Sequence, residues 1–231
     1  MMRPHTQTGW LLVAGAFLLF VPYAVLAFTF DYPDILRQDS GTILTRFHEA
    51  GPSLIWTWWA FAMVGLPLLV ACVQLGQQLE TRLPFMRWAT TLGVVGLVVQ
   101  MTGLLRWVFV VPVLARSYAT GDAATQAAAR VGFELMHQLG GVLLGEHIGQ
   151  LFTIAWTISL AYALGHLGLL PRWAVIWGYV AGGIYLLAQT ELFATVMPGL
   201  PVVGVAGWLG STLWLVWLLI VGVRYQGPTR V

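Results

Sequence analysis

The chain has 231 residues, of which 58% are apolar and only 9% are charged. A soluble domain carries about 25% charged residues, so this composition excludes an ordinary soluble enzyme, a disordered chain and a nucleic-acid-binding protein. The mean hydropathy of +0.80 and the net charge of +2 indicate a polytopic membrane protein that has no acidic partner.

Six segments are long and apolar enough to cross a bilayer, which takes about 20 residues. They cover residues 9–30, 53–78, 88–115, 135–165, 172–196 and 202–224. The first lacks a small-residue cleavage site, so we expect a span rather than a signal peptide. The segments are continuously apolar rather than alternating, which favours helices over strands. The sequence therefore predicts an all-α bundle of six transmembrane helices, forming a single domain over residues 1–231.

Arginine placement predicts the orientation, because cytoplasmic loops carry an excess of positive charge. With the N-terminus inside, the cytoplasmic side holds Arg3, Arg82, Arg87, Arg172, Arg224 and Arg230, and the opposite side holds Arg37, Arg46, Arg116 and Arg130. Both termini are therefore expected in the cytoplasm. In the outer loop 116–134, the alanine-rich part predicts a short helix, capped by Thr120 or Asp122, that leads into the fourth span.

Glycines at four-residue spacing mark one face of the fourth span. Gly141, Gly145 and Gly149 form this stripe. Such a stripe allows another helix backbone to approach closely, so we expect a tight helix pair there. The chain is also compatible with a homo-oligomer.

Three charged residues fall inside the predicted spans: Arg106, Glu146 and Glu191. Arg106 lies about nine residues below the outer surface and Glu146 about eleven, and at about 1.5 Å per residue these depths agree within one helical turn. A lone charge at the bilayer centre costs about 2.5–3.5 kcal/mol on insertion scales. Arg106 and Glu146 are therefore expected to meet directly or through one water.

Further polar residues gather in the outer half of the predicted bundle. At 100° per residue, Glu146, Gln150, Thr153 and Thr157 form one stripe, with His147 beside it. The candidate catalytic residues are Glu146, His147 and Arg106, and the candidate ligand-binding residues are His137, Gln150, His48, Glu49, Glu191, Trp56 and Trp59. A purely structural network that fixes helix registry is the alternative interpretation.

Three stretches carry a family resemblance. GLLRWVFVVPVLARSY at 103–118 and FELMHQLGGVLLGEHIGQLFTIAWT at 133–157, together with LGLLPRWAVIWGYVAGG at 167–183, resemble a bacterial six-helix membrane protein family catalogued as a domain of unknown function. The resemblance implies a multi-pass protein of the bacterial cytoplasmic (inner) membrane. It implies no activity.

Several functions stay open on these residues. The first is a membrane-embedded site that binds a small lipophilic molecule or alters it by acid–base chemistry, with Glu146 and His147 exchanging protons and Arg106 orienting an anionic or carbonyl group. A bound metal or haem is a less favoured alternative, for which His48 and His137 are the candidate ligands. An ion-coupled carrier and a structural membrane subunit complete the set, and whether the protein is an enzyme stays open.

Overall fold

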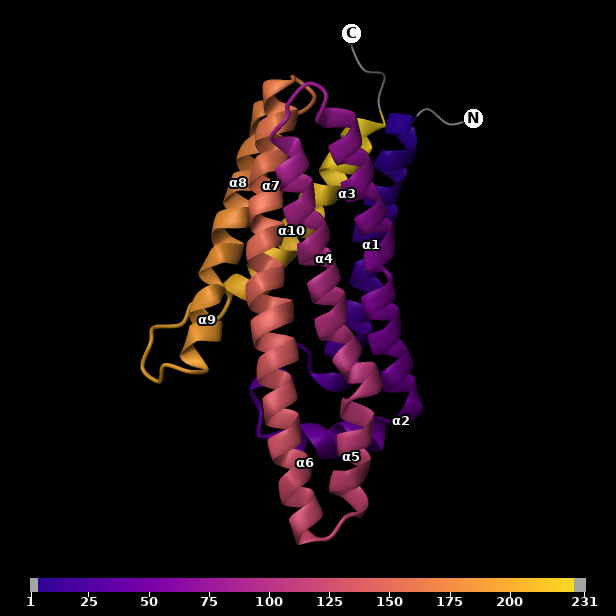
Figure 1. The fold of residues 1–231 in the computed structure, drawn as a ribbon, viewed down its shortest axis with the longest axis vertical. Coiled ribbons are helices and arrows are strands. Elements are labelled where there is room, and N and C mark those ends of the chain that lie inside the picture. The colour runs from indigo at the N-terminus through magenta and orange to yellow at the C-terminus, as the bar shows by residue number, and fades with distance from the viewer. Residues whose placement is uncertain (1–3, 227–231) are drawn as a thin grey trace. The chain divides into compact units, whose positions relative to one another are not determined.

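The structure is a computed structural model that describes residues 4–226, and its regular elements in that range are all helices (Figure 1). The elements are α1 (Pro4–Phe30), η1 (Asp34–Arg37), α2 (Ser40–Met63), α3 (Gly65–Leu79), α4 (Met86–Phe109), α5 (Val111–Thr120), α6 (Ala123–Met136), η2 (His137–Ile148), α7 (Gly149–His166), α8 (Arg172–Leu187), α9 (Gln189–Ala194) and α10 (Ala206–Tyr225). Arg3, Arg230 and Val231 lie outside the described residues.

Five continuous helical stretches are long and apolar enough to cross a membrane. They are His5–Phe30, Ser40–Leu79, Met86–Thr120, Ala123–His166 and Ala206–Tyr225. In hydrocarbon, a helix satisfies its own backbone hydrogen bonds, which is why continuously apolar segments of this length fold as helices. The all-α prediction is confirmed, and the chain is a multi-pass membrane protein.

The segment 172–196, predicted as a single span, is interrupted. Helix α8 ends at Leu187 after 16 residues, and the short helix α9 begins at Gln189. At the break, the Ala188 N–H donates to Tyr185 O and the Glu191 N–H donates to Ala188 O, so the chain turns more tightly than an α-helix. Three consecutive polar residues, Gln189–Glu191, follow this break.

The outer loops are more helical than predicted. Helix α2 already begins at Ser40, inside the region 31–52 that was expected to be a loop. In the loop 116–134, the predicted helix is confirmed as the start of α6, and Asp122 is its cap because its carboxylate accepts from Thr125 N at 2.9 Å. Hydrogen bonds from Thr125 lower the pKa of Asp122. Thr120 does not cap the helix; its hydroxyl donates to Arg116 O.

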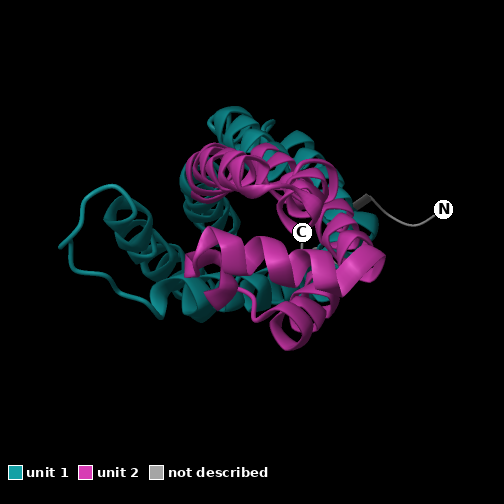
Figure 2. Ribbon diagram, turned by 90° about the horizontal axis from the view of Figure 1, so that it is seen from below, with its two compact units in different colours: residues 1–17, 65–98, 147–231 teal, residues 18–64, 99–146 magenta. Residues whose placement is uncertain are grey.

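The chain divides into two compact units, each assembled from separate stretches of sequence (Figure 2). Unit 1 contains residues 1–17, 65–98 and 147–231, and unit 2 contains residues 18–64 and 99–146. Glu146 is the last residue of unit 2 and His147 the first residue of the following stretch of unit 1. Residues that are adjacent in the predicted site therefore belong to different units.

Unit 2 is built around α2, which packs against α5 and α6. Helix α2 bends at Gly51, whose φ of 66° and ψ of −157° suit only glycine, and Pro52 follows it. Its first turn is tied to α6: Arg130 pairs with the cap residue Asp39, and the Ser40 hydroxyl donates to Glu134 Oε1 at 2.7 Å. These contacts join the first turn of α2 to α6.

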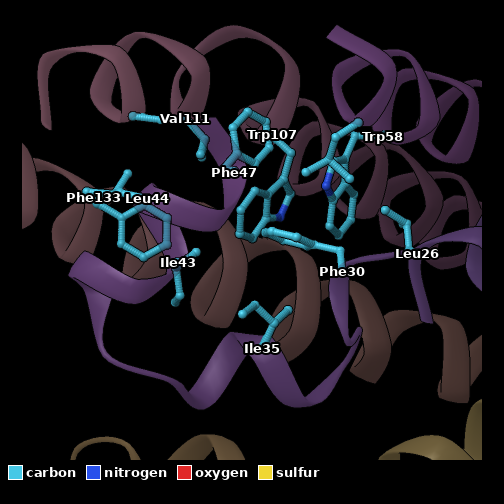
Figure 3. Packing of buried hydrophobic residues seen from close by; sticks show 12 residues of the cluster. Leu26, Phe30, Ile35, Ile43, Leu44, Phe47, Trp58, Trp107, Val111 and Phe133 are labelled. Carbon is cyan, nitrogen blue, oxygen red and sulfur yellow. The ribbon is translucent and has the colours of Figure 1, made fainter. Parts of the chain in front are cut away.

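Aromatic side chains fill the core of unit 2 (Figure 3). Trp107 stacks on Trp58, with ring centroids 4.8 Å apart and planes 8° apart, and it also stacks on Phe47. Phe30 and Phe133 meet Trp107 edge to face. Trp58 and Trp107 are both fully buried. Trp107 is the centre of this aromatic core, because it contacts all four of the other rings.

Unit 1 brings α8 against α7 and α10. The indole N–H groups of α10 join these helices: Trp217 donates to Ala174 O and Trp214 donates to Thr157 Oγ1, both at 2.9 Å. Thr157 in turn donates to Thr153 O. The Thr157 hydroxyl thus belongs to a buried structural network, as the alternative interpretation of the polar stripe predicts.

The described ends of the chain meet within unit 1. The rings of His5 in α1 and Tyr225 in α10 are 5.2 Å apart, edge to face. Tyr225 OH donates to Gln78 Oε1 at 2.8 Å, and Gln78 Nε2 donates to Thr8 Oγ1 at 2.9 Å. This network joins α1, α3 and α10 at one end of the unit.

Candidate functional site

Arg106 lies in α4 with 7% of its surface exposed. Its Nη1 donates to the carbonyl oxygen of Gly103, one turn earlier in the same helix. Its Nε atom is buried and has no hydrogen-bond partner among the described residues. The guanidinium carbon lies 5.2 Å from the centroid of the Trp107 ring, so a permanent cation stands against the aromatic core of unit 2.

Arg106 and Glu146 form no direct ion pair among the described residues, and contact between them through one water stays a prediction. Glu146 instead accepts from Arg37 Nη2 at 3.1 Å, and both side chains of this pair are partly exposed. Arg37 lies outside the predicted spans, so a comparison of depths along the spans does not include it. Arg37 ends the short helix η1, from which its long side chain reaches Glu146. Glu146 and Arg37 still act on Arg106 electrostatically.

The segment that carries Glu146 is a π-helix of 12 residues, His137–Ile148. Its backbone hydrogen bonds run from i to i+5, so its side chains do not follow the 100° spacing assumed for an α-helix. Gln150 and Thr153 lie in α7, where α-helical spacing holds. Extending their polar stripe back to Glu146 therefore has no basis in helix geometry.

His137 caps the end of α6 and begins the π-helix. Its ring stacks on Phe133 at 5.4 Å and meets Trp107 edge to face at 6.5 Å. Neither ring nitrogen has a hydrogen-bond partner among the described residues, although both are buried. Trp58 Nε1 is also buried and unpartnered. Arg106, His137 and Trp58 therefore present unpartnered nitrogens around the single ring of Trp107.

His147 and Gln150 come together in unit 1 through Gln189. His147 Nδ1 lies 2.6 Å from Gln189 Oε1, and Gln189 Nε2 donates to Gln150 Oε1 at 2.9 Å. With its oxygen facing the imidazole, Gln189 favours the tautomer that carries a proton on Nδ1. Phe193 packs edge to face on the same imidazole, while Glu191 is half-buried on α9.

Four predicted ligand-binding residues lie on the exposed surface of α2. His48 and Glu49 are exposed, and neither has a hydrogen bond or ring contact with a described residue. Trp56 and Trp59 are 66% and 42% exposed, and they contact each other at 5.9 Å. The indole inside the core is Trp58, the one member of this tryptophan cluster that was not a candidate. The structure therefore does not bring His48 to His137.

The expected close helix pair is confirmed between α4 and the π-helix of unit 2. A Cβ atom added to Gly103 would lie 2.7 Å from Gly140 O and 2.9 Å from the Cα of Gly145. At Gly141, an added Cβ would lie 2.5 Å from Arg106 Nη2. The glycines thus bring two backbones together and leave the space that the guanidinium occupies.

Within residues 4–226, no group of three or more His, Cys, Asp or Glu side chains lies close enough to hold a metal ion. The side chains around Arg106 instead present nitrogens and aromatic rings. Nitrogen–hydrogen groups donate hydrogen bonds, so this arrangement suits a ligand that accepts them.

A family model matches residues 7–222, which is nearly the whole chain. The family is described as a domain of unknown function, DUF4386. The chain belongs to this family. The match confirms the resemblance found in the sequence, and it assigns no activity to the residues above. No curated protein and no solved structure matches the chain.

Three residues around Arg106 and Glu146 were not among the sequence-based candidates: Arg37, Trp58 and Trp107. Trp107 follows Arg106 directly, and an aromatic residue beside an intramembrane cation is a usable signal for a packed cationic site. Arg37 carries no comparable signal, because its partner is 109 positions away in the chain.

Proposed function

We propose that the protein binds a small lipophilic molecule that carries an acidic or carbonyl group, and that this group binds at Arg106. The observation that carries the proposal is the buried, unpartnered Nε of Arg106 beside the two unpartnered nitrogens of His137. Three buried nitrogens without a hydrogen-bond partner in one core are unusual, because about 90% or more of buried polar groups have a partner.

The energetic case rests on the charge of Arg106. An unsatisfied buried polar group costs about 1–3 kcal/mol, and more when it is charged. A guanidinium does not escape this cost by losing its proton, since its pKa is too high. The nearest acid, Glu146, is ion-paired with Arg37. A ligand carboxylate or carbonyl oxygen would supply the missing acceptor in a setting where hydrogen bonds to a charge are strong.

The aromatic core supplies contacts for the apolar body of the ligand. Trp58, Trp107 and Phe133 surround the nitrogens, and large aromatic side chains are the usual lining of a site for a lipophilic molecule. His137 and the Arg37–Glu146 pair are the groups in unit 2 that we assign to proton exchange with the bound molecule. A carrier function has no observation in its favour beyond the same residues.

Binding of oleate and of oleyl alcohol to the purified full-length protein tests this proposal, because the two probes differ only in the acidic group. We expect oleate to bind at least about tenfold more tightly, since one hydrogen bond to a charge is worth about 1.4 kcal/mol or more. Native mass spectrometry, with a fluorescent fatty-acid displacement assay, measures both affinities.

Two histidine variants make the test specific. His137→Phe keeps a ring against Phe133 and Trp107 but removes both nitrogens, and it is expected to weaken oleate about tenfold. His48→Phe changes an exposed residue and is expected to leave oleate binding unchanged. Equal binding of the acid and the alcohol would overturn the proposal. A strong haem absorption band that disappears in His137→Phe would replace it with the haem alternative.

We also propose that the protein lies in the bacterial cytoplasmic membrane, with six crossings and both termini in the cytoplasm. The contact between His5 and Tyr225 supports an even number of crossings, because the two ends of the described chain then lie on one side. Five helices qualify as spans by length and hydropathy, and α8 with α9 supplies the sixth. The arginine distribution supports the cytoplasm as that side.

Reporter fusions test this topology. A reporter fused after Val231 is expected to be active only in its cytoplasmic form, and one inserted within 123–129 only in its extracytoplasmic form. A fusion at 197–204, between α9 and α10, is the critical control, since an extracytoplasmic signal there requires α8 with α9 to cross. A cytoplasmic signal at that position would contradict six crossings.

A further inference from the structure

A polar cavity of about 350 Å³ lies in unit 2, apart from Arg106. It is open to the surface and lies where the end of α1, the helix η1 and the first turns of α2 meet. Its lining consists of Ala27, Asp31, Tyr32, Asp34, Ile35, Gln38 and Arg46. A volume of this size falls within the range of about 300–1,000 Å³ that small-molecule sites occupy.

The cavity carries one excess negative charge. Asp31 is neutralised by Arg46, whose Nη1 lies 2.7 Å from Asp31 Oδ2. Arg46 is further held with its guanidinium 6.0 Å from the Phe30 ring. The carboxylate of Asp34 has neither an ion pair nor a hydrogen bond with any residue in the described range. A positively charged group entering the cavity would therefore meet an unpaired anion.

An aromatic wall stands beside this anion. Tyr32 lines the cavity, and its ring packs edge to face on Trp58 at 5.3 Å and on Tyr23 at 5.5 Å. A third edge contact, with Phe61 at 6.0 Å, completes the support. The ring is thus held in place before a ligand arrives. A carboxylate beside a fixed aromatic ring is a recurring arrangement for binding organic ammonium groups.

We propose that this cavity binds an organic ammonium group. Asp34 neutralises the charge, the ring of Tyr32 contacts the alkyl groups on nitrogen, and Ala27 provides apolar contact for an attached carbon chain. The ammonium group comes either from a lipid head group or from a free amine. The cavity shares an aromatic contact with the Arg106 site, because Tyr32 packs on Trp58 and acts electrostatically on Arg106. Asp34 is not among the groups assigned to the Arg106 site, so a change at Asp34 distinguishes the failure of one proposal from the failure of the other.

Choline and 3,3-dimethyl-1-butanol test the proposal, because they have nearly the same shape and differ in charge. We expect choline to bind the purified full-length protein with saturation, at least about tenfold more tightly than the neutral alcohol. Isothermal titration calorimetry measures both. Equal affinities, or no binding of any ammonium probe including a lysolipid, would overturn the proposal.

Three variants locate the site. Asp34→Asn keeps the shape of the side chain and removes its charge, so we expect choline affinity to fall about tenfold. Tyr32→Leu removes the ring and is expected to weaken binding severalfold. Asp122→Asn removes an exposed acid that does not line the cavity and should change nothing. An equal loss in Asp34→Asn and Asp122→Asn would reduce the effect to overall charge and refute the site.

Lysophosphatidylcholine and lysophosphatidylglycerol distinguish the two sources of the ammonium group. If only the lysolipid with choline binds and free choline does not, the cavity recognises a lipid head group. If free choline binds equally well, it recognises a soluble amine. In either case, Asp34→Asn must lose binding of the ammonium probe. The same variant must retain oleate binding at Arg106. Loss of both ligands would mean that Asp34→Asn damages the fold. Asp34→Glu, which keeps the charge, then decides: retained choline binding supports the site, and loss of choline binding with oleate binding intact overturns it.

Discussion

Replacing Gly103 with leucine is expected to destabilise unit 2 strongly. The backbone of the π-helix leaves no room, because a Cβ at this position would lie 2.7 Å from Gly140 O and 2.9 Å from the Gly145 Cα. Backbone atoms do not move aside as the end of a side chain does. Overpacking typically costs about 1–3 kcal/mol, and a backbone clash belongs at or above the upper end.

A thermal denaturation series measures this effect. For a chain of this size, about 3 kcal/mol corresponds to a fall in Tm of about 6–12 °C. Gly145→Ala should cost less than Gly103→Leu, since its Cβ would lie 3.3 Å from Gly140 O and 3.6 Å from Gly103 Cα, whereas Gly145→Leu should destabilise the pair strongly. Gly183→Leu is the matched control, because a Cβ there meets nothing within 4 Å. Equal Tm values for Gly103→Leu and Gly183→Leu would contradict close packing of α4 on the π-helix.

The parts of the fold that depend on local chemistry could be predicted from the sequence. Long apolar segments become helices because the bilayer offers the backbone no other partner. Asp122 begins α6 because a cap acts within three residues of the helix start. The glycine spacing predicted the close helix pair for a similar reason, since small residues permit contact wherever the partner helix comes from.

The register of the π-helix could not be predicted in this way. The change from α to π hydrogen bonding over His137–Ile148 alters the direction of Glu146 and His147 together. Nothing in the apolar periodicity marks this change, apart from a concentration of glycine at Gly140, Gly141 and Gly145. A projection at 100° per residue therefore assigned Glu146 to a stripe that begins only in α7.

The partners of the candidate residues depend on tertiary contacts that spacing along one helix does not contain. Gln189 joins His147 to Gln150 because the chain breaks between α8 and α9 and presents an amide there. Arg37 reaches Glu146 from a segment that the sequence presented as a loop. Which of these polar residues meet could therefore not be predicted from the spacing along one helix.

Replacing Arg106 with methionine is expected to preserve or raise the thermal stability of the ligand-free protein while abolishing oleate binding. Methionine is flexible and of similar length, so it fills the space beside Gly141 without a charge. The change removes a buried cation whose Nε has no partner. Because an unsatisfied buried group costs about 1–3 kcal/mol, its removal is expected to raise the free energy of unfolding by about that amount. A purely structural role for Arg106 predicts the opposite sign.

Glu146→Gln is the matched comparison. Its partner Arg37 and Glu146 itself are 30% and 22% exposed in their side chains, so solvent screens the pair and its loss should cost about 1 kcal/mol or less. Arg106→Lys keeps the charge but not the planar donor fork, so we expect weakened oleate binding at an almost unchanged Tm.

The measurements are Tm without ligand and oleate affinity, made on the same preparations of the wild type, Arg106→Met, Arg106→Lys and Glu146→Gln. Breaking a buried ion pair by removing one partner costs about 3–5 kcal/mol, because the other charge is left uncompensated. If Arg106→Met loses stability on that scale, Arg106 serves the fold as one half of such a pair. The acceptor for its Nε then belongs to the protein rather than to a ligand, and the binding site loses its centre. A stable Arg106→Met variant that no longer distinguishes oleate from oleyl alcohol assigns the guanidinium to the ligand instead.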